Sequence, residues 1–166
     1  MVKPTSSVLK PASLAIVKAD PQGADALALL REAAIEAREL YPELFTADMP
    51  WPENQPTPER GVYLVAYLDG VPVACGALRP IDGDSVEVRR MFVTAKARRK
   101  GLARTILSEL EVRTADLGFK IMRLETGNRQ LSAMALYESF GFKRIAPFGQ
   151  YENDPLSVCF EKVVNA

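Results

Sequence analysis

The chain has 166 residues, 48% of them hydrophobic, which predicts one compact domain with its own core. Basic and acidic residues number 21 each, so no overall field draws the protein to nucleic acid or to an anionic membrane. Histidine is absent, which excludes histidine metal sites and every catalytic scheme that uses a histidine base.

Other features narrow the class further. No apolar segment approaches the ~20 residues that span a bilayer, and the first residues lack a signal-like stretch, so we expect a soluble, cytoplasmic protein without a membrane partner. Cys75 and Cys159 lie far apart in apolar runs, which favours buried free thiols over a disulfide. No residue spacing suggests a metal site.

The first third of the chain predicts a strand, a helix and a long loop. Residues 1–11 are polar and are expected to be flexible, and a strand follows at residues 14–17. Asp20 is expected to cap a helix that runs to about Leu40. Residues 49–58 contain four prolines among ten residues and predict an ordered loop.

Strand patterns, turns and two helices follow along the rest of the chain. Three sequential antiparallel strands are predicted at residues 62–68, 71–78 and 85–93. The later elements are a helix from Gly101 to Gly118, a strand at 119–125, a helix from an Asn128 cap to Gly141, and strands at 142–145 and 156–164. The order β-α-β-β-β-α-β-α-β-β predicts an α/β fold, a mixed central sheet flanked by helices.

The strand, helix and strand between Val86 and Glu125 form one unit. Such a unit crosses over right-handed and makes its two strands parallel.

A basic turn, Thr94-Ala-Lys-Ala-Arg-Arg-Lys-Gly-Leu-Ala103, joins the third of the antiparallel strands to the next helix. The free N–H groups and the dipole at a helix N-terminus favour an anion, and the flanking cations add attraction. Taken alone, the turn is more typical of a solvated charged loop before an ordinary helix. As a phosphate site, it would act mainly through the backbone N–H groups of Arg99 and of residues 101–104.

Two motifs resemble those of the GNAT superfamily of acyl-CoA-dependent N-acetyltransferases. Arg98-x-x-Gly101-x-Ala103 resembles the pyrophosphate-binding motif, and Leu136-Tyr-Glu-Ser-Phe-Gly-Phe142 resembles a second signature at a helix end. The element order is also the GNAT order. The resemblance implies a single GNAT domain over residues 1–166 with acetyl-CoA as co-substrate.

The resemblance also implies a cofactor site. Its residues would be Met91, Phe92, Val93, Arg98, Arg99, Lys100, Gly101, Leu102, Ala103, Arg104 and Tyr137, with Asn128 or Gln130 in place of the usual family asparagine. In the family, the strand that contains Met91 lies along the pantetheine arm. Strand alternation predicts that Glu87, Arg89, Met91 and Val93 share one face.

Acyl transfer to an amine needs a base for the amine proton and an acid for the thiolate. By resemblance, Glu87 acts as the base, usually through water, and Tyr137 donates a proton to the thiolate. Glu87 has the alternative of pairing with Arg89 or Arg79 only to stabilise the sheet. Tyr137 has the alternative of simple packing at the helix end.

The acceptor side is less defined by the sequence. Trp51, Glu87, Glu125 and Tyr151 are candidate acceptor contacts, although Trp51 is equally suited to covering a core edge. We expect a small-molecule amine as acceptor. The alternatives are a protein lysine or N-terminus, a non-catalytic acyl-CoA-binding module, and a nucleic-acid-binding module, which the neutral charge disfavours. Family members are frequently dimers, so a homodimer is a further option.

Overall fold

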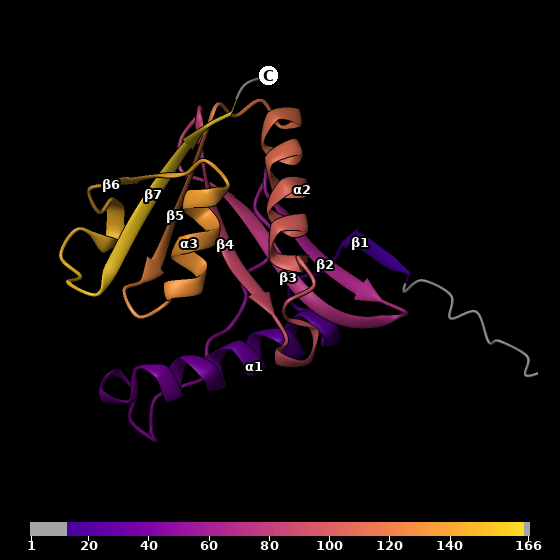
Figure 1. Cartoon of the computed structure of the whole chain (residues 1–166), viewed down its shortest axis with the longest axis vertical. Helices are drawn as coiled ribbons and strands as arrows, with labels where there is room; N and C mark the ends of the chain where they lie inside the picture. The colour runs from indigo at the N-terminus through magenta and orange to yellow at the C-terminus, as the bar shows by residue number, and fades with distance from the viewer. Residues whose placement is uncertain (1–12, 165–166) are drawn as a thin grey trace, which may run out of the picture.

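The computed structural model describes residues 13–164, so the expected flexibility of residues 1–11 lies outside the described residues. Seven strands form one sheet, and three α-helices and three short 3-10 helices connect them (Figure 1). The strands are β1 (Leu14–Lys18), β2 (Val62–Leu68), β3 (Val71–Pro80), β4 (Ser85–Val93), β5 (Ile121–Gly127), β6 (Lys143–Ile145) and β7 (Ser157–Val163). The helices are α1 (Ala24–Leu40), α2 (Leu102–Asp116) and α3 (Leu131–Ser139), with 3-10 turns η1 (Pro42–Leu44), η2 (Ala95–Ala97) and η3 (Gly149–Tyr151).

The sheet is mixed, with strand order β1-β2-β3-β4-β5-β7-β6. Only β4 and β5 pair in parallel, and every other neighbouring pair is antiparallel. The predicted order of elements and the predicted strand–helix–strand unit are therefore confirmed. Within residues 13–164, no helix combines the length and the apolar character that a membrane crossing requires.

Two apolar layers hold the helices to opposite faces of the sheet. The larger layer packs α2 and part of α3 on one face, and its fully buried side chains include Ile106, Leu107 and Leu110 of α2. The smaller layer packs α1 on the other face through Ala26 and Leu29. Figure 1 shows α1 crossing below the sheet and α2 standing against it. The two buried cysteines are free, as predicted.

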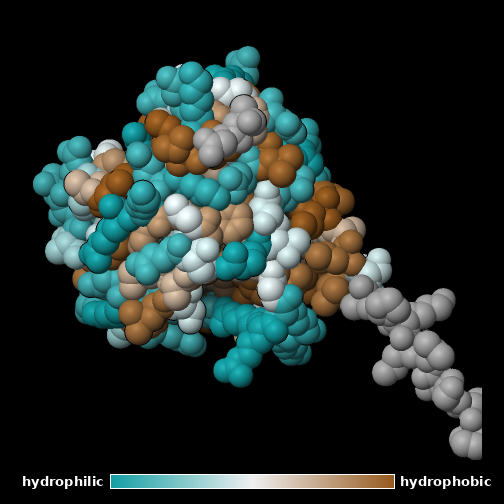
Figure 2. Space-filling model, turned by 45° about the horizontal axis from the view of Figure 1, so that its top comes forward, coloured by the Kyte–Doolittle hydropathy of each residue, from teal (hydrophilic) through white to brown (hydrophobic). Residues whose placement is uncertain are grey.

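The exposed surface is not uniformly polar. Figure 2 shows hydrophobic residues gathered on the right-hand side of the molecule, at the edge of the sheet where β1 lies. Leu14 and Val17 of β1 and Val71 at the β2–β3 turn are exposed apolar residues. β1 is an edge strand, with one side of its backbone unpaired in the sheet. The homodimer suggested by family resemblance stays a prediction.

Two predicted helix caps are wrong. Helix α1 begins at Ala24 with Gly23 as its N-cap, because the carboxylate of Asp20 accepts the N–H of Gln22 at 2.9 Å and closes a separate turn before the helix. Helix α3 begins at Leu131 after Gln130, and the N–H of Asn128 is used in a 2.8 Å bond to the carbonyl of Leu156.

Candidate active site

The basic turn before α2 presents a run of free backbone N–H groups. Within the described residues, the N–H groups of residues 99–104 donate no hydrogen bond, and the first bonded N–H of α2 is that of Thr105. Gly101, with φ 75°, takes a left-handed conformation that costs other residues about 1–2 kcal/mol. Arg99 also has a positive φ of 64°. This turn is a concave donor surface for an anion.

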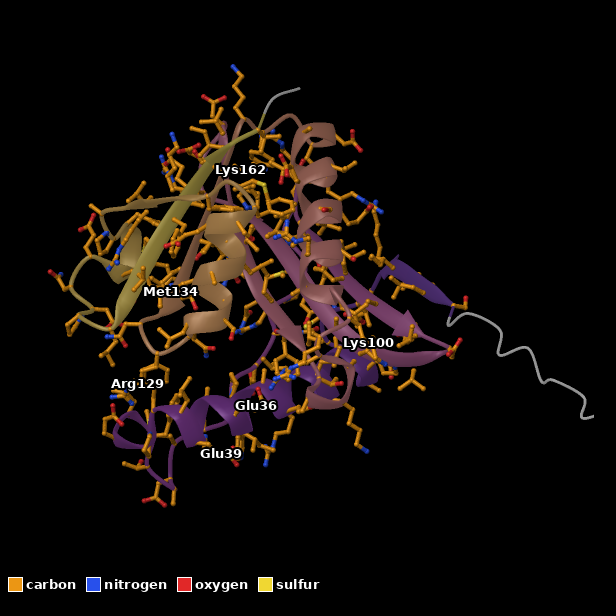
Figure 3. The ribbon with its side chains drawn as sticks, viewed as in Figure 1. Glu36, Glu39, Lys100, Arg129, Met134 and Lys162 are labelled. Carbon is orange, nitrogen blue, oxygen red and sulfur yellow. The ribbon has the colours of Figure 1, made fainter. Side chains whose placement is uncertain are left out.

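The arginine side chains around the turn are held in place. The guanidinium of Arg98 donates to both carboxylate oxygens of Glu36, at 2.8 and 2.6 Å, and to the carbonyl of Val93 at 3.1 Å. Arg104 reaches across to the hydroxyl of Ser139 on α3. Figure 3 shows Glu36 on α1 below this turn. The Arg98–Glu36 pair therefore ties α1 to the predicted phosphate-binding turn.

Strands β4 and β5 part beside this turn. Their pairing ends at Val88 and Leu124, while β4 continues along β3 to Val93. The β5-facing backbone edge of residues 89–93 has no partner strand and is free to pair with an extended ligand. Such an edge forms where two parallel strands diverge, and it gives access from one face of the sheet to the other.

The predicted face of β4 is wrong beyond Arg89. Arg90 has a positive φ of 59°, and the β3–β4 register shifts between Cys75 and Ala77. A β-bulge adds one residue to one strand and so reverses the alternation after it. Met91 and Val93 therefore pack with the α2-side core, whereas Phe92 packs on the α1 side. Glu87 and Arg89 do not share a face with Met91 and Val93.

A groove with a volume of ≈ 1090 Å³ runs between α1, β4, the basic turn and α3. Most of the predicted cofactor residues line it, namely Met91, Phe92, Val93, Arg98, Arg99, Gly101, Leu102, Ala103, Arg104, Gln130 and Tyr137. Lys100 and Asn128 do not line the groove. Asn128 and Gln130 were the two candidates for the cofactor contact of the family asparagine, and of these two only Gln130 lines the groove.

The groove wall formed by α1 was not predicted. It consists of Leu29, Leu30, Ala33, Ala34 and Ala37, with Phe45, Pro50 and Pro52 from the following loop. Small residues on one face of a helix look like ordinary core positions in a sequence. The proline-rich loop was a usable signal, because long loops are often functional.

Tyr137 lies at the groove with its ring buried and its hydroxyl free. The ring packs edge-on against Phe142, with centroids 5.9 Å apart, and is tilted against Phe160 at 6.1 Å. Within residues 13–164 the hydroxyl makes no hydrogen bond, although the residue lines the groove. Burial and the nearby charge of Glu125 raise the pKa of Tyr137 to about 12. The phenol is therefore protonated at neutral pH.

Glu87 and Tyr151 come together on the α1-side face of the sheet. Glu87 is buried, with 8% of its surface exposed, and its carboxylate accepts the hydroxyl of Tyr151 at 2.8 Å. Arg89 approaches the same carboxylate at 4.0 Å. Burial and the hydrogen bond to Glu87 raise the pKa of Tyr151 to about 12. Neither Glu87 nor Tyr151 lines the large groove.

Glu125 lines the groove, as does Glu36, whose carboxylate is paired with Arg98. Glu125 accepts the hydroxyl of Ser157 at 3.0 Å, and burial is the main cause that raises its pKa, with smaller contributions from the charges of Asp154 and Glu87. A raised pKa brings a carboxylate closer to the range in which general bases work. Glu125 was predicted only as an acceptor contact.

Trp51 does not line the groove. The guanidinium of Arg31 lies 3.4 Å from its ring centroid and that of Arg38 lies 3.6 Å from it. Arg38 also donates to the carbonyl of Met49 at 3.0 Å. Cation–π contacts of this kind fasten a loop to a helix. Trp51 therefore anchors the proline-rich loop on α1, while its neighbours Pro50 and Pro52 line the groove.

Several known proteins are similar to part of this sequence. Among curated relatives, the IAA acetyltransferase of Azospirillum brasilense is 41% identical over 101 residues, 60% of this chain and 66% of the relative. The uncharacterized N-acetyltransferase YsnE of Bacillus subtilis is 38% identical over 90 residues, 53% of this chain and 60% of that protein. The matches thus span about two thirds or less of these relatives' length.

Solved structures agree over nearly the whole chain. A Klebsiella pneumoniae structure assigned to the acyl-CoA N-acyltransferases is 29% identical with a TM-score of 0.75, and the match covers 92% of this chain and 98% of that one. A GNAT acetyltransferase from Elizabethkingia anophelis with acetyl-CoA bound shares the fold, with a TM-score of 0.65 at 17% identity over 90% of this chain and 97% of that one. The model of the acetyltransferase (GNAT) family matches residues 27–142, and the chain belongs to this family.

Proposed function

We propose that the protein transfers an acetyl group from acetyl-CoA to the primary amine of a small molecule, by direct attack in a ternary complex. The observation that carries the proposal is the groove itself. It is lined both by Arg99 and residues 101–104, whose N–H groups are free, and by Tyr137 and Glu125. An anion site, an unpaired strand edge and acid–base groups in one groove match the needs of thioester aminolysis.

The turn fits the pyrophosphate of acetyl-CoA. Its free donors form a run from Arg99 to Arg104, and an added side chain at Gly101 would meet no protein atom within 4 Å, so the loop is open on that side. Backbone N–H groups at a helix N-terminus bind phosphate oxygens without a side-chain contribution. Arg104 adds positive charge, whereas the charge of Arg98 is offset by its ion pair with Glu36.

The unpaired edge of β4 fits the extended arm of the same molecule. Residues Met91 to Val93 follow the last β4–β5 pair, and the three residues line the groove. Amides of a bound arm would pair with this edge as another strand does. N–H groups on the same edge would polarise the thioester carbonyl.

Tyr137 is proposed as the acid for the departing thiolate. Its hydroxyl is free of internal partners and its pKa of about 12 keeps the proton in place at neutral pH. A thiol has an ordinary pKa near ~8.5, well below that of this phenol, so complete proton transfer to a free thiolate is uphill, and the O–H of Tyr137 acts by hydrogen-bonding the sulfur as its negative charge develops.

Glu87 is proposed as the base, through a water molecule, because it does not itself line the groove. The hydroxyl of Tyr151 orients its carboxylate at 2.8 Å. Glu125 is the second candidate, since it lines the groove beside Tyr137 and burial raises its pKa. Substitution of each carboxylate by glutamine, followed by pH–rate profiles, distinguishes the two.

A small-molecule acceptor is supported by the curated relative named IAA acetyltransferase. The test is release of thiol from acetyl-CoA against a panel of small amines and lysine-containing peptides, with initial rates at several concentrations of both substrates. Faster turnover of small amines and intersecting double-reciprocal lines are expected. Preference for peptides would favour a protein acceptor, parallel lines would indicate a covalent enzyme intermediate, and cofactor binding without turnover would indicate a non-catalytic module.

A further inference from the structure

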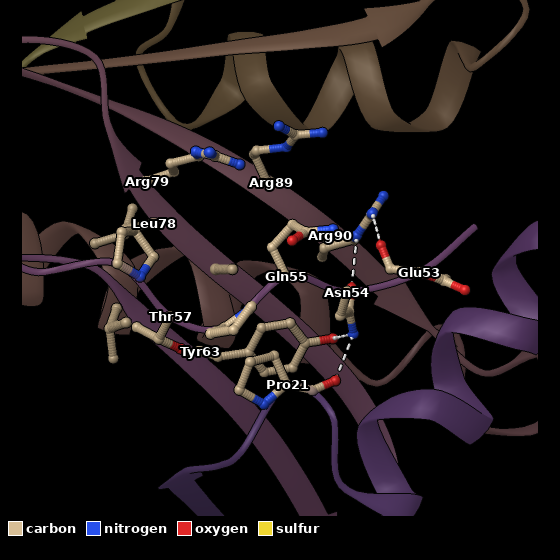
Figure 4. Close-up of a pocket in the computed structure, with 14 residues that line it drawn as sticks. Pro21, Glu53, Asn54, Gln55, Thr57, Tyr63, Leu78, Arg79, Arg89 and Arg90 are labelled. Carbon is tan, nitrogen blue, oxygen red and sulfur yellow. Dashed lines mark hydrogen bonds between the residues drawn. The ribbon is translucent and has the colours of Figure 1, made fainter.

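A second, smaller cavity lies beside the groove and is rich in arginine. It has a volume of ≈ 240 Å³ and lies between β3, β4 and the proline-rich loop. Its lining includes Arg79, Arg89 and Arg90, together with Asn54 and Tyr63 (Figure 4). None of the roles proposed above uses this cavity, which is called the arginine pocket below.

The register of β3 and β4 explains why the arginines gather. Arg79 lies opposite Glu87, and Ala77 lies opposite Arg89. Arg79 and Arg89 are thus diagonal neighbours on one face, a spacing that long side chains can bridge. The small side chain of Ala77 leaves the space opposite Arg89 open, and Figure 4 shows the Arg79 and Arg89 side chains side by side above the pocket.

The three arginines differ in how fully their donors are used. Arg90 is committed, because its Nε donates to the side-chain oxygen of Asn54 at 2.9 Å and it also donates to the carbonyl of Glu53 at 3.2 Å. Within residues 13–164, Arg79 has neither a hydrogen bond nor an ion pair, and Arg89 has only the 4.0 Å approach to Glu87. Two neighbouring guanidiniums therefore retain free donors.

The electrostatics of this face leave a positive excess. Burial is the main cause that lowers the pKa of Arg90, and repulsion by the charge of Arg89 lowers it further. Of the described carboxylates nearby, Glu53 lines the pocket against three arginines, and that of Glu87 already accepts the hydroxyl of Tyr151. A bound anion would relieve the repulsion between the arginines. Paired guanidinium donors match a carboxylate in particular, because its two oxygens accept two parallel N–H bonds.

The arginine pocket and the groove share part of their walls. Tyr63 and Arg90 line both spaces, and Met91, next to Arg90, lines the groove where the thioester is expected. The pocket therefore borders Arg90, the residue that directly precedes the strand edge assigned to the thioester. The pocket is smaller than the ~300–1,000 Å³ of typical drug-sized sites, which suits a compact acceptor rather than a peptide.

We propose that Arg79 and Arg89 bind a carboxylate of the acceptor, so that the acceptor class is a small amine that also carries a carboxylate, as an amino acid does. The inference rests on the acetyl transfer proposed above and specifies its acceptor. Arg89 and Glu87 are 4.0 Å apart, which allows one compact acceptor to place its carboxylate at Arg89 and its amine on the side of Glu87.

The experiment compares matched pairs of acceptors with acetyl-CoA. Each pair is an amino acid and its carboxamide, methionine and methioninamide for example, and kcat/KM is corrected for the fraction of free amine at the assay pH. We expect the carboxylate to exceed its carboxamide at least about tenfold, as loss of a charge-assisted bidentate contact implies. Equal or faster use of the carboxamides overturns the inference.

Variants identify the residues responsible. In Arg79→Gln and Arg89→Gln, the ratio of carboxylate to carboxamide kcat/KM should fall toward one, mainly through KM, and Arg79→Lys should restore part of it. Arg144→Gln removes an exposed arginine from β6 and serves as the matched control, with the ratio unchanged. If the wild-type protein prefers the carboxylate and this preference is unchanged in both Arg79→Gln and Arg89→Gln, the assignment of these two arginines is wrong.

A binding measurement separates this inference from the acetyl transfer itself. Calorimetric titration of N-acetylmethionine, and of its carboxamide, into the protein with CoA present does not depend on turnover. Binding of the carboxylate alone, lost in the Arg79→Gln/Arg89→Gln double variant, supports the pocket even where no amine is acetylated. If amines are acetylated with no preference for a carboxylate, and both ligands bind equally, the carboxylate site is refuted and the proposed acetyl transfer still stands.

Discussion

Replacing Tyr137 by phenylalanine removes one hydroxyl and little else. The ring contacts with Phe142 and Phe160 do not involve the hydroxyl, and the hydroxyl has no internal hydrogen-bond partner in the described part of the chain. No buried partner is left unsatisfied, so the free energy of unfolding should stay within about 0.5 kcal/mol of wild type. Thermal unfolding followed by circular dichroism checks this expectation.

The same substitution should slow catalysis through kcat. Loss of a positioned acid lowers kcat by about tenfold or more, equivalent to about 1.4 kcal/mol of barrier, while KM for acetyl-CoA changes little. The assay is thiol release at saturating acetyl-CoA and amine. Because burial raises the pKa of Tyr137 to about 12, the wild-type rate should show no loss attributable to this proton below about pH 10. An unchanged kcat in a folded variant would refute the acid assignment.

Three further substitutions test other parts of the site. Glu87→Gln should abolish the acidic limb of the pH profile of kcat/KM, and retention of that limb would transfer the base role to Glu125. Glu125→Gln should raise the Tm at neutral pH. The pKa of Glu125 is higher in the folded protein than its ordinary 4.5, so the wild-type protein loses stability as the pH rises from 4.5 through the folded-state pKa. The gain in Tm should therefore vanish below pH 4.5, and a gain at every pH would contradict this argument. Gly101→Ala should raise KM for acetyl-CoA several-fold, because an alanine at φ 75° costs about 1–2 kcal/mol. Gly83→Ala is the control and should leave KM unchanged, since Gly83 has equal space for a Cβ but no positive φ. Equal effects of the two substitutions would contradict the conformational argument.

The elements that carry local signals were predictable. Gly118 and Gly141 stop α2 and α3 with positive φ of 86° and 101°, as their positions in the sequence indicate. The helix start at Gly101, with its positive φ, was predictable from a glycine and its neighbours, and its role in binding an anion stays a prediction. Tyr137 followed from its motif and reaches the groove. These features depend on a few adjacent residues, which a sequence records directly.

Features set by distant parts of the chain were not predictable in the same way. The bulge at Arg90 depends on pairing with β3, and it reverses the faces of Met91 and Val93. The cap of α1 was mispredicted for a local reason, because the Asp20 side chain can bond to either of two nearby sets of N–H groups and closes a turn before the helix. Trp51 is held by two arginines of α1, and nothing in the loop sequence indicates that contact.

The most direct test of the central claim measures both products of the reaction at once. Acetyl-CoA and the best amine of the panel are incubated with the protein, and the thiol released and the N-acetyl amine formed are quantified together. We predict equal amounts of both, with no thiol above background when the amine is omitted. Thiol release that does not depend on the amine, or no acetylated amine from any member of the panel, would contradict the account.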